Sequence, residues 1–390
     1  MSQQLISHSP DLKRLQDEGY EMEIQGGYLI VHHIPYLNSA KGVSYGTLVS
    51  TLTLNANQTT RPDHHVIYFA GDFPCHNNGQ PITAIQHGTA QQILGGINVK
   101  FSFSNKPLTG YADYYDKITT YSRIISSPAK AVDENATEKT YKIIPSPEQD
   151  SVFHYVDTNS SRANIARSNS KFEGQRIAIV GLGGTGAYIL DLVAKTPVKE
   201  IHLFDGDLFL QHNAFRSPGA ATIGQLAEQQ MKAAYFAGIY SSMHRNVIAH
   251  SHYLDDSNLE SLNGMSYVFI CVDRNSVRVN LMQALKNWGI SFIDTGLGIN
   301  LVDDQLIGSV RVTTATACKN DHLPLRVATT DGADDEYATN IQIADLNALN
   351  AALAVIKWKK LAGFYQDLEE EHHCAYAINV SKLFNEDSTA

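Results

Sequence analysis

The sequence predicts an α/β protein. Its larger, C-terminal part is expected to form a doubly wound, Rossmann-like and mostly parallel sheet, preceded by a smaller β-rich or α+β domain. After about residue 172, apolar segments such as RIAIV, EIHLF and YVFI alternate with helical stretches such as AYILDLVAKT, a pattern typical of parallel α/β folds. Before residue 127 the segments have strand character with turns between them, and helical periodicity is weak.

The length of 390 residues exceeds what one hydrophobic core usually organises, so two domains are expected. We place the N-terminal domain at residues 1–127, a polar linker at 128–157, and the second domain at 158–390. Within the first domain, Gly26 and Gly27 predict a hairpin turn, and VSYGTLVSTLTLNA and HHVIYFAG predict further strands. A short helix is expected near residues 162–168.

Composition excludes several classes of protein. Hydrophobic residues make up 43% and charged residues 18% of the chain, as in folded soluble proteins. The net charge of −10 and the lack of a basic run disfavour nucleic acid as a partner. The sequence has no apolar run of membrane-spanning length and no secretory signal, which predicts a cytoplasmic protein. Four cysteines without a C-x-x-C pair disfavour a disulfide framework or a structural zinc site.

A glycine loop follows the strand RIAIV and precedes a helix. Gly181, Gly183 and Gly186 fit G-x-G-x-x-G, in which the backbone N–H groups approach a phosphate that a Cβ atom would push away. Asp205 ends the next strand, where a carboxylate can bind ribose hydroxyls. The pattern predicts a nucleotide site, but it serves ATP, NAD and FAD proteins alike.

Further residues resemble the E1-like superfamily, which includes the adenylating enzymes of the ThiF and MoeB type and the ubiquitin-activating enzymes. Gly184 makes the loop G-x-G-G-x-G, and FDGDLFLQHNAFR is similar to the family's D-x-D-x(n)-N-x-x-R signature. The segment IADLNALNAALAVIKWKKL is similar to its late helix. The resemblance covers about residues 158–385, and the matching charged and polar positions are Asp205, Asp207, Asn213, Arg216, Lys232 and Asp273.

The resemblance implies ATP- and Mg²⁺-dependent adenylation of a C-terminal carboxylate, that of a ubiquitin-like protein, in a bacterial conjugation or sulfur-carrier pathway. It assigns ATP binding to the four glycines, Asp205, Asp207, Asn213, Arg216 and Lys232, and Mg²⁺ to Asp273. Arg216 and Lys232 are the cations expected to stabilise the charge that develops on the phosphates. The implied partners are the ubiquitin-like protein, an E2-like enzyme and a second copy of the chain in a homodimer.

Two further assignments stay open at this level. Arg162, in NSSRANIAR, resembles the arginine that reaches the ATP site of the neighbouring subunit, while a solvated linker arginine is an equal or better interpretation. Cys318 lies in the crossover loop that the resemblance places at residues 311–341, where some relatives form a thioester. A plain loop cysteine is the favoured interpretation, and Asp321 and His322 would then orient the carboxylate tail or the acceptor.

The other cysteines and the histidine clusters have simpler interpretations. Cys271 is expected in the core, and Cys374 with His372 and His373 is expected to be a surface cluster. In the N-terminal domain, His64, His65, Cys75 and His76 invite a metal or thiol interpretation, but adjacent strand residues point to opposite faces. We expect a module that binds a partner protein.

Two other functions compete with adenylation. An NAD-dependent Rossmann oxidoreductase would leave Arg216, Lys232 and Asp273 without a shared purpose, because hydride transfer builds no charge on a phosphate chain. A non-catalytic E1-like scaffold would not need the complete set of charged residues.

Overall fold

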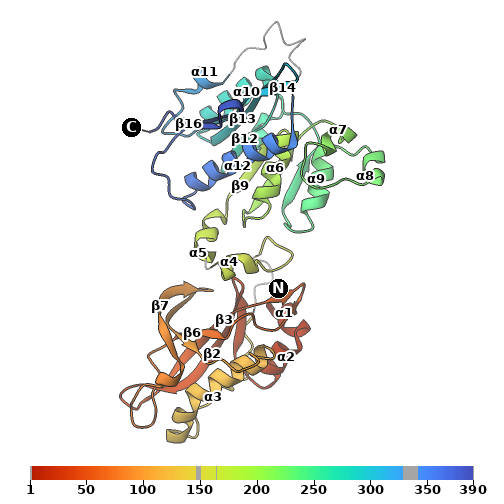
Figure 1. Ribbon diagram of the computed structural model, residues 1–390. Coiled ribbons are helices and arrows are strands. Elements are labelled where there is room, and N and C mark those ends of the chain that lie inside the picture. The colour runs from red at the N-terminus through yellow and green to blue at the C-terminus, as the bar shows by residue number, and fades with distance from the viewer. Residues whose placement is uncertain (1, 146–150, 164, 328–340, 390) are drawn as a thin grey trace. The chain divides into compact units, whose positions relative to one another are not determined.

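The computed structural model describes residues 2–145, 151–163, 165–327 and 341–389 (Figure 1). The chain divides into two compact units, and the boundary lies between Ser168 and Asn169. We refer to them as unit 1, up to Ser168, and unit 2, from Asn169, and describe each by itself.

Unit 1 contains a six-stranded antiparallel sheet with the order β1-β2-β3-β6-β8-β7. The turn between the first two strands has the form that the sequence predicts. Gln25 pairs with Tyr28, and Gly26 and Gly27 both have positive φ angles, as a two-residue hairpin turn of type I′ requires. The strands are β1 Met22–Gln25, β2 Tyr28–Leu37, β3 Val43–Thr51, β6 Val66–Ala70, β7 Gln86–Leu94 and β8 Ile97–Ser104, and a small separate pair is formed by β4 Leu54–Asn55 and β5 Gln58–Thr59.

A 19-residue helix, α3 (Tyr114–Val132), packs on β2 and was not predicted from the sequence. Its buried face includes Tyr114, Ile118, Tyr121 and Ile125, which recur at helical spacing, but the intervening Thr, Ser and Tyr weaken the apolar contrast. The helix runs through the boundary that we placed between residues 127 and 128. The remaining helices of unit 1 are α1 Ser2–His8, α2 Pro10–Asp17, the 3₁₀ turn η1 Thr83–Ile85 and α4 Thr158–Arg162, and α5 Ala166–Asn169 crosses into unit 2.

Residues 158–168 belong to unit 1, whereas we predicted the second domain from residue 158 onward. Local contacts explain this. The Tyr28 hydroxyl donates to the carbonyl oxygen of Ser161 at 3.1 Å, and a Cβ atom on Gly27 would lie 2.4 Å from the Ser161 hydroxyl. The helix α4 is thereby fixed against the β1–β2 turn.

Unit 2 contains an eight-stranded mixed sheet with the order β11-β10-β9-β12-β13-β14-β15-β16. The first five strands in this order run parallel, and the other three extend the sheet as antiparallel neighbours. The predicted fold class is therefore confirmed. The strands are β9 Arg176–Val180, β10 Glu200–Phe204, β11 Val247–His250, β12 Tyr267–Ile270, β13 Ser291–Val302, β14 Gln305–Ala315, β15 His373–Ala377 and β16 Lys382–Glu386.

Helices cover both faces of the parallel strands, as a doubly wound sheet requires. One core contains residues of α6 (Gly184–Val193), α9 (Lys232–Tyr240) and α12 (Ala344–Leu361), and the opposite core contains residues of α10 (Asn275–Asn287). The predicted late helix is α12, and it packs closely against α6. The shorter helices are η2 Ser170–Phe172, α7 Gln211–Ala214, α8 Ile223–Ala227, η3 Leu259–Leu262, α11 Leu323–Arg326 and η4 Ile378–Val380.

The strand order fixes where a ligand can bind. The chain passes from β9 outward to β10 and β11, and then returns to β12 on the other side of β9. The loops that follow β9 and β12 therefore leave the sheet in opposite directions and open a crevice at the carboxyl ends of these strands. The predicted glycine loop follows β9 at this point.

The crossover loop predicted at residues 311–341 begins later than we expected. Residues 311–315 form the end of β14, where they pair with residues 292–296 of β13. Residues 328–340 lie outside the described part of the chain. Where the structure is described, none of its helices has both the length and the apolar character needed to cross a membrane.

Candidate nucleotide site

The glycine loop is shaped by the packing of unit 2 at three of its four glycines. Gly181 has a φ of +90°, and a Cβ atom there would lie 2.6 Å from the Cys271 carbonyl oxygen, at the end of β12. A Cβ atom on Gly184 or Gly186 would also collide, at 1.8 Å from Asn347 and 1.9 Å from the Gly181 carbonyl oxygen. Gly183 differs: its φ is −68°, and the nearest atom to an added Cβ is 3.7 Å away. The protein itself therefore does not require glycine at position 183.

The two aspartates after β10 are not equivalent. The Asp205 carboxylate is buried and accepts hydrogen bonds from the backbone N–H groups of Leu182, at 2.7 Å, and Asp207, at 2.8 Å. It thus ties the glycine loop to the loop after β10. Burial raises the pKa of the Asp205 carboxyl, although the nearby Lys232 ammonium opposes this. The Asp207 side chain, by contrast, is 51% exposed.

Lys232 begins α9 and is almost fully buried beside both aspartates. Its Nζ lies 2.7 Å from Asp207 Oδ2 and 3.8 Å from Asp205 Oδ1. Burial favours a raised pKa for Asp207, but the hydrogen bonds from Lys232 and Tyr253 outweigh it and the pKa of Asp207 is lowered. Lys232 is thus fixed at the carboxyl edge of the sheet in an ion pair with Asp207, and it is buried rather than at the surface of a cleft.

The turn at residues 213–217 carries buried polar atoms that form no hydrogen bond within the part of the chain that the structure describes. These atoms are Asn213 Nδ2, Arg216 Nε and Ser217 Oγ. Three such atoms in one turn are unusual, because buried polar groups in folded proteins almost always have partners. A polar ligand bound at this turn would supply the missing hydrogen-bond partners.

Three residues of the site were missed by sequence reasoning. Asn347 on α12 accepts from Thr185 at 3.0 Å and donates to the Arg216 carbonyl at 3.4 Å, so it joins α6 to the Arg216 turn. Gln342 accepts from the Gly184 N–H at 3.4 Å. Tyr253, in the loop after β11, donates to Asp207, and its ring lies over Gly206. These polar residues are distant in sequence from the motif residues that they contact, so only the tertiary fold reveals these contacts.

Asp273 is exposed and lies three residues after β12, at the same edge of the sheet. A buried network holds the preceding backbone. Arg278 donates to the Val272 carbonyl oxygen and, at 2.9 Å, to Asp294, a fully buried carboxylate on β13. Arg311 of β14 lies 2.8 Å from the other oxygen of Asp294. Sequence reasoning missed this network as well.

Cys318 is exposed and is not brought to the nucleotide site. It follows β14, whose end at Ala315 pairs with Phe292 near the amino end of the parallel strands, whereas the glycine loop lies at their carboxyl ends. Lys319 pairs with Asp321 at 3.0 Å. His322 is buried, and its ring packs edge-on at 5.9 Å from that of His372.

Arg162 lies in unit 1, where its guanidinium is 3.3 Å from Asp63. The in trans role of Arg162 stays a prediction, as does a thioester at Cys318.

Cys374, His372 and His373 were expected to form a surface cluster, but both histidines are buried and Cys374 is half-buried. The reason is that His373 and Cys374 belong to β15, which lies between β14 and β16 in the sheet. Cys75 is buried, and burial raises the pKa of its thiol. Burial also raises the thiol pKa of Cys271, to about 12, and of Cys374, to about 11. Among the described residues, no group of three or more His, Cys, Asp or Glu side chains is placed to hold a metal ion. The interpretation of His64, His65, Cys75 and His76 as a metal site therefore gains no support.

Known protein families match both parts of the chain. Residues 10–158 match a domain of unknown function, DUF6791, and residues 159–367 match the ThiF family. The ubiquitin-like modifier-activating enzyme 5 of Rattus norvegicus is 23% identical over 178 residues, which are 43% of this chain and 44% of that protein. The chain thus aligns with less than half the length of this curated relative.

Solved structures that resemble this chain have lower sequence identity to it than the rat enzyme has. Escherichia coli MccB with MccA-N7isoASN is 13% identical and has a TM-score of 0.49, over 60% of this chain and 72% of that chain. E. coli MccB with ATP is 14% identical with a TM-score of 0.48, over 59% and 72% of the two chains. We therefore base the fold on strand order and register. Because residues 159–367, more than half of the 390 residues, match the family, the chain belongs to the ThiF family.

Proposed function

We propose that unit 2 binds ATP and transfers AMP to a carboxylate, so that an acyl-adenylate forms and pyrophosphate leaves. The observation that carries this proposal is the turn at residues 213–217, whose buried polar atoms find no hydrogen-bond partner among the described residues, beside a glycine loop at the topological switch point. Membership of the ThiF family supports it. The name of the rat relative, a ubiquitin-like modifier-activating enzyme, agrees with it.

Each group in the crevice has a role in this proposal. The backbone of the glycine loop faces the phosphates, and Gly183 leaves room for their approach because no protein atom occupies the position of its Cβ. Asp207, which is exposed, offers its carboxylate to the ribose hydroxyls. Asp205 instead fixes the two loops, because its oxygens already accept backbone N–H groups.

Arg216 and Lys232 stabilise the charge that builds up when a carboxylate oxygen attacks the α-phosphate. The new bond joins this oxygen to phosphorus, the bond to the bridging oxygen breaks, and the electron pair leaves with pyrophosphate. Preorganised cations in a crevice lower this barrier without reorganisation. The unpaired Arg216 Nε fits a phosphate acceptor, and Lys232 reaches it by exchanging its bond to Asp207.

The chain also fits a magnesium ion, which binds proteins through one or two carboxylates together with substrate phosphates. Asp273 is an exposed carboxylate at the correct edge of the sheet, and Arg278 and Asp294 hold the backbone next to it. When bound, Mg²⁺ supplies positive charge to the phosphates.

The finer proposal is that the activated carboxylate is the C-terminal glycine of a ubiquitin-like protein, in a bacterial conjugation or sulfur-carrier pathway. A homodimer, an E2-like partner and a cytoplasmic location belong to this proposal. The charged set supports adenylation over NAD-dependent hydride transfer, which gives Arg216 and Lys232 no shared task.

Pyrophosphate exchange tests the proposal. With Mg²⁺, labelled pyrophosphate and a ubiquitin-like protein that ends in Gly-Gly, the full chain is expected to form labelled ATP. Arg216→Ala and Lys232→Ala should each lower the rate on the order of 10²–10³-fold, as expected for the loss of one transition-state donor. The double variant should lose less than the product of the single losses, because both cations act on the same charge. Lys195→Ala, which removes an exposed lysine from the turn after α6, is the control.

A further inference from the structure

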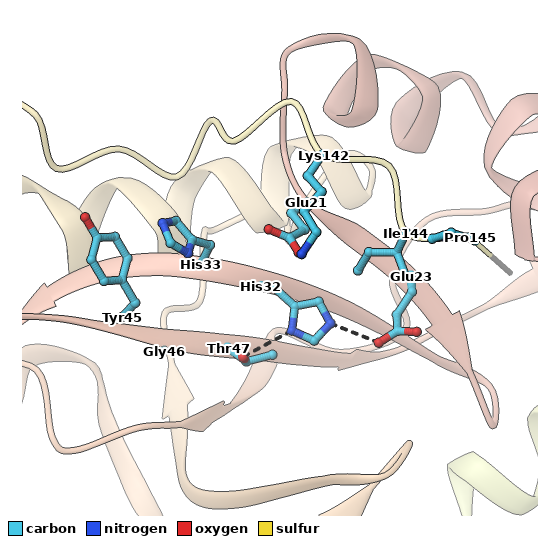
Figure 2. A pocket seen from close by; sticks show the side chains of 10 residues that line it. All are labelled: Glu21, Glu23, His32, His33, Tyr45, Gly46, Thr47, Lys142, Ile144 and Pro145. Atoms are coloured by element: carbon cyan, nitrogen blue, oxygen red, sulfur yellow. Dashed lines mark hydrogen bonds and ion pairs between the residues drawn. The ribbon is translucent and has the colours of Figure 1, made fainter.

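Unit 1 contains a cavity of about 560 Å³ on the part of its sheet formed by β1, β2 and β3. This is within the range of roughly 300–1,000 Å³ found for ligand sites. Figure 2 shows its lining, which combines charged, aromatic and apolar side chains: Glu21, Glu23, His32, His33, Tyr45, Gly46, Thr47, Lys142, Ile144 and Pro145. The cavity lies wholly in unit 1, so its role is independent of the nucleotide site.

The sheet is irregular where the cavity forms. Val31 pairs with Leu48, and Ile34 pairs with Gly46, so a bulge places both His32 and His33 opposite Thr47. His33 has a φ of 60°, in the left-handed region that few non-glycine residues adopt. Bulges of this kind redirect side chains and are frequent beside functional sites. Here the bulge brings two imidazoles to one cavity.

Hydrogen bonds fix the central group of the cavity. His32 Nε2 lies 2.9 Å from Glu23 Oε1, and His32 Nδ1 lies 3.4 Å from the Thr47 hydroxyl, as the dashed lines in Figure 2 show. With Nε2 protonated, the imidazole donates to Glu23 and accepts from Thr47. Glu23 is thus held in one orientation, and its other oxygen, Oε2, can accept a hydrogen bond from a ligand.

The cavity is lined by two carboxylates, Glu21 and Glu23, and by one lysine, Lys142. Glu21 is neutralised by Lys142, at 2.9 Å, and accepts a hydrogen bond from Thr140 at 3.2 Å. Although burial opposes it, the Lys142 ammonium holds the pKa of Glu21 below its usual range, so Glu21 is charged at neutral pH. Because Lys142 already neutralises Glu21, Glu23 is the carboxylate whose charge a ligand can neutralise.

The walls of the cavity suit an apolar stem. The rings of His33 and Tyr45 stack with their centroids 4.1 Å apart, and Figure 2 shows them side by side. Ile144 and Pro145 add aliphatic surface. An aromatic face next to a carboxylate is the arrangement that binds a basic side chain, since the methylenes pack on the rings while the charged end meets the carboxylate.

We propose that this cavity binds an arginine or lysine side chain of a partner polypeptide, with Glu23 as its counter-ion and the Tyr45–His33 pair as its aromatic wall. The guanidinium and the ammonium share this chemistry. A flat guanidinium would in addition stack on the rings, which an ammonium cannot do.

Titration of the full chain with three peptides tests this proposal. The peptides are acetyl-Gly-Arg-Gly-amide, acetyl-Gly-Lys-Gly-amide and acetyl-Gly-Gln-Gly-amide, and binding is followed by NMR or calorimetry. At least one basic peptide should bind more tightly than the glutamine peptide. Glu23→Gln, which keeps an acceptor for His32 but removes the charge, should weaken this binding about tenfold. The exposed Glu134→Gln should change nothing.

Lys142→Met provides a readout that a merely structural ion pair would not produce. Removal of the competing cation frees Glu21, so a basic peptide should bind roughly fivefold more tightly, as for an exposed ion pair. If Glu23→Gln does not fold, Lys142→Met and Tyr45→Ala decide the question, with tighter and weaker binding expected. Equal binding of all three peptides, or unchanged affinity in these variants, would overturn the proposal. Neither outcome depends on ATP binding or adenylation.

Discussion

At the scale of single residues, burial distinguishes side chains that the sequence presents as equals. The D-x-D pattern marks both Asp205 and Asp207, yet only Asp207 is substantially exposed, and Asp205 is occupied by two backbone N–H groups. The motif marks both aspartates as candidates for the site. It could not predict which of them a ligand can reach, because this depends on the path of two loops.

Tyr253 lies directly beside the proposed ribose ligand. Tyr253 is 57% exposed, its ring covers Gly206, and its hydroxyl donates to Asp207, the proposed ribose ligand. We expect the ring to stack on the base. Tyr253→Ala should weaken ATP binding about tenfold, in line with the roughly 1–3 kcal/mol of base–aromatic stacking.

Tyr253→Phe keeps the ring and removes the hydroxyl, which competes with the ribose hydroxyls for Asp207. This variant should therefore bind ATP as tightly as the wild type or more tightly. Tripolyphosphate, which has no base, should bind equally to all three proteins. Equal ATP affinity in Tyr253→Ala and wild type, measured by calorimetry, would rule out the stacking role.

At the scale of elements, the glycine loop allows a test that separates binding from folding. Gly183→Ala adds a Cβ atom at a negative φ with no protein atom nearer than 3.7 Å, so the fold should tolerate it. If phosphates approach this position, ATP affinity should fall by at least about tenfold, because the methyl group holds them away from the backbone N–H groups.

Gly238→Ala is the matched control, since it lies within α9 and a Cβ atom there has open space. Alanine is less favourable than glycine at a helix N-cap and more favourable inside a helix, so Gly183→Ala should melt slightly below and Gly238→Ala slightly above the wild type, each by no more than roughly 4 °C. A Gly183→Ala variant with wild-type ATP affinity would show that the loop has a purely structural role.

The helix α3 carries a pH dependence for unit 1. Lys117 is 1% exposed and donates to Ser50 and to the His64 carbonyl oxygen, both at 3.0 Å. Burial lowers the pKa of Lys117 to about 7, from a normal value of 10.5. Between these two values the unfolded chain binds more protons than the folded chain, so stability rises with pH by up to about 1.4 kcal/mol per unit. Below pH 7 Lys117 is protonated in both the folded and the unfolded chain, so the folded chain bears the full free-energy cost of burying its charge.

Lys117→Met removes this buried charge. Its melting temperature should therefore exceed that of the wild type at pH 6, and the difference should shrink by pH 9. Thermal melts of unit 1 in the full chain, followed by circular dichroism, would contradict this account if the difference were the same at both pH values.

The elements that the sequence predicted well are those whose pattern is local. The strands β9, β10 and β12 are apolar because both faces are covered, and the hairpin at Gly26 and Gly27 follows from two adjacent glycines. The helix α3 was missed because its buried face includes tyrosines and a lysine that only the tertiary structure satisfies. The Arg278–Asp294–Arg311 network was missed for the same reason.

At the scale of the whole molecule, the sequence predicted two parts but placed their boundary differently from the compact units. Residues 158–168 were assigned to the second domain by resemblance, and the ThiF match starts at residue 159, yet these residues pack in unit 1. Family patterns follow ancestry, whereas compact units follow contacts such as that of Ser161 with Tyr28. Nothing in the sequence of unit 1 predicted its cavity, because a bulge in β2 creates it.

Whether unit 2 uses ATP is decided by calorimetric titration of the full chain with ATP and with NAD, each in the presence of Mg²⁺. We predict saturable binding of ATP at one site per chain and little binding of NAD. ATP affinity should fall when Mg²⁺ is removed and in the Asp273→Asn variant. Binding of NAD more tightly than ATP would contradict the proposed use of ATP, because the charges of Arg216, Lys232 and Asp273 would then serve no phosphate chain.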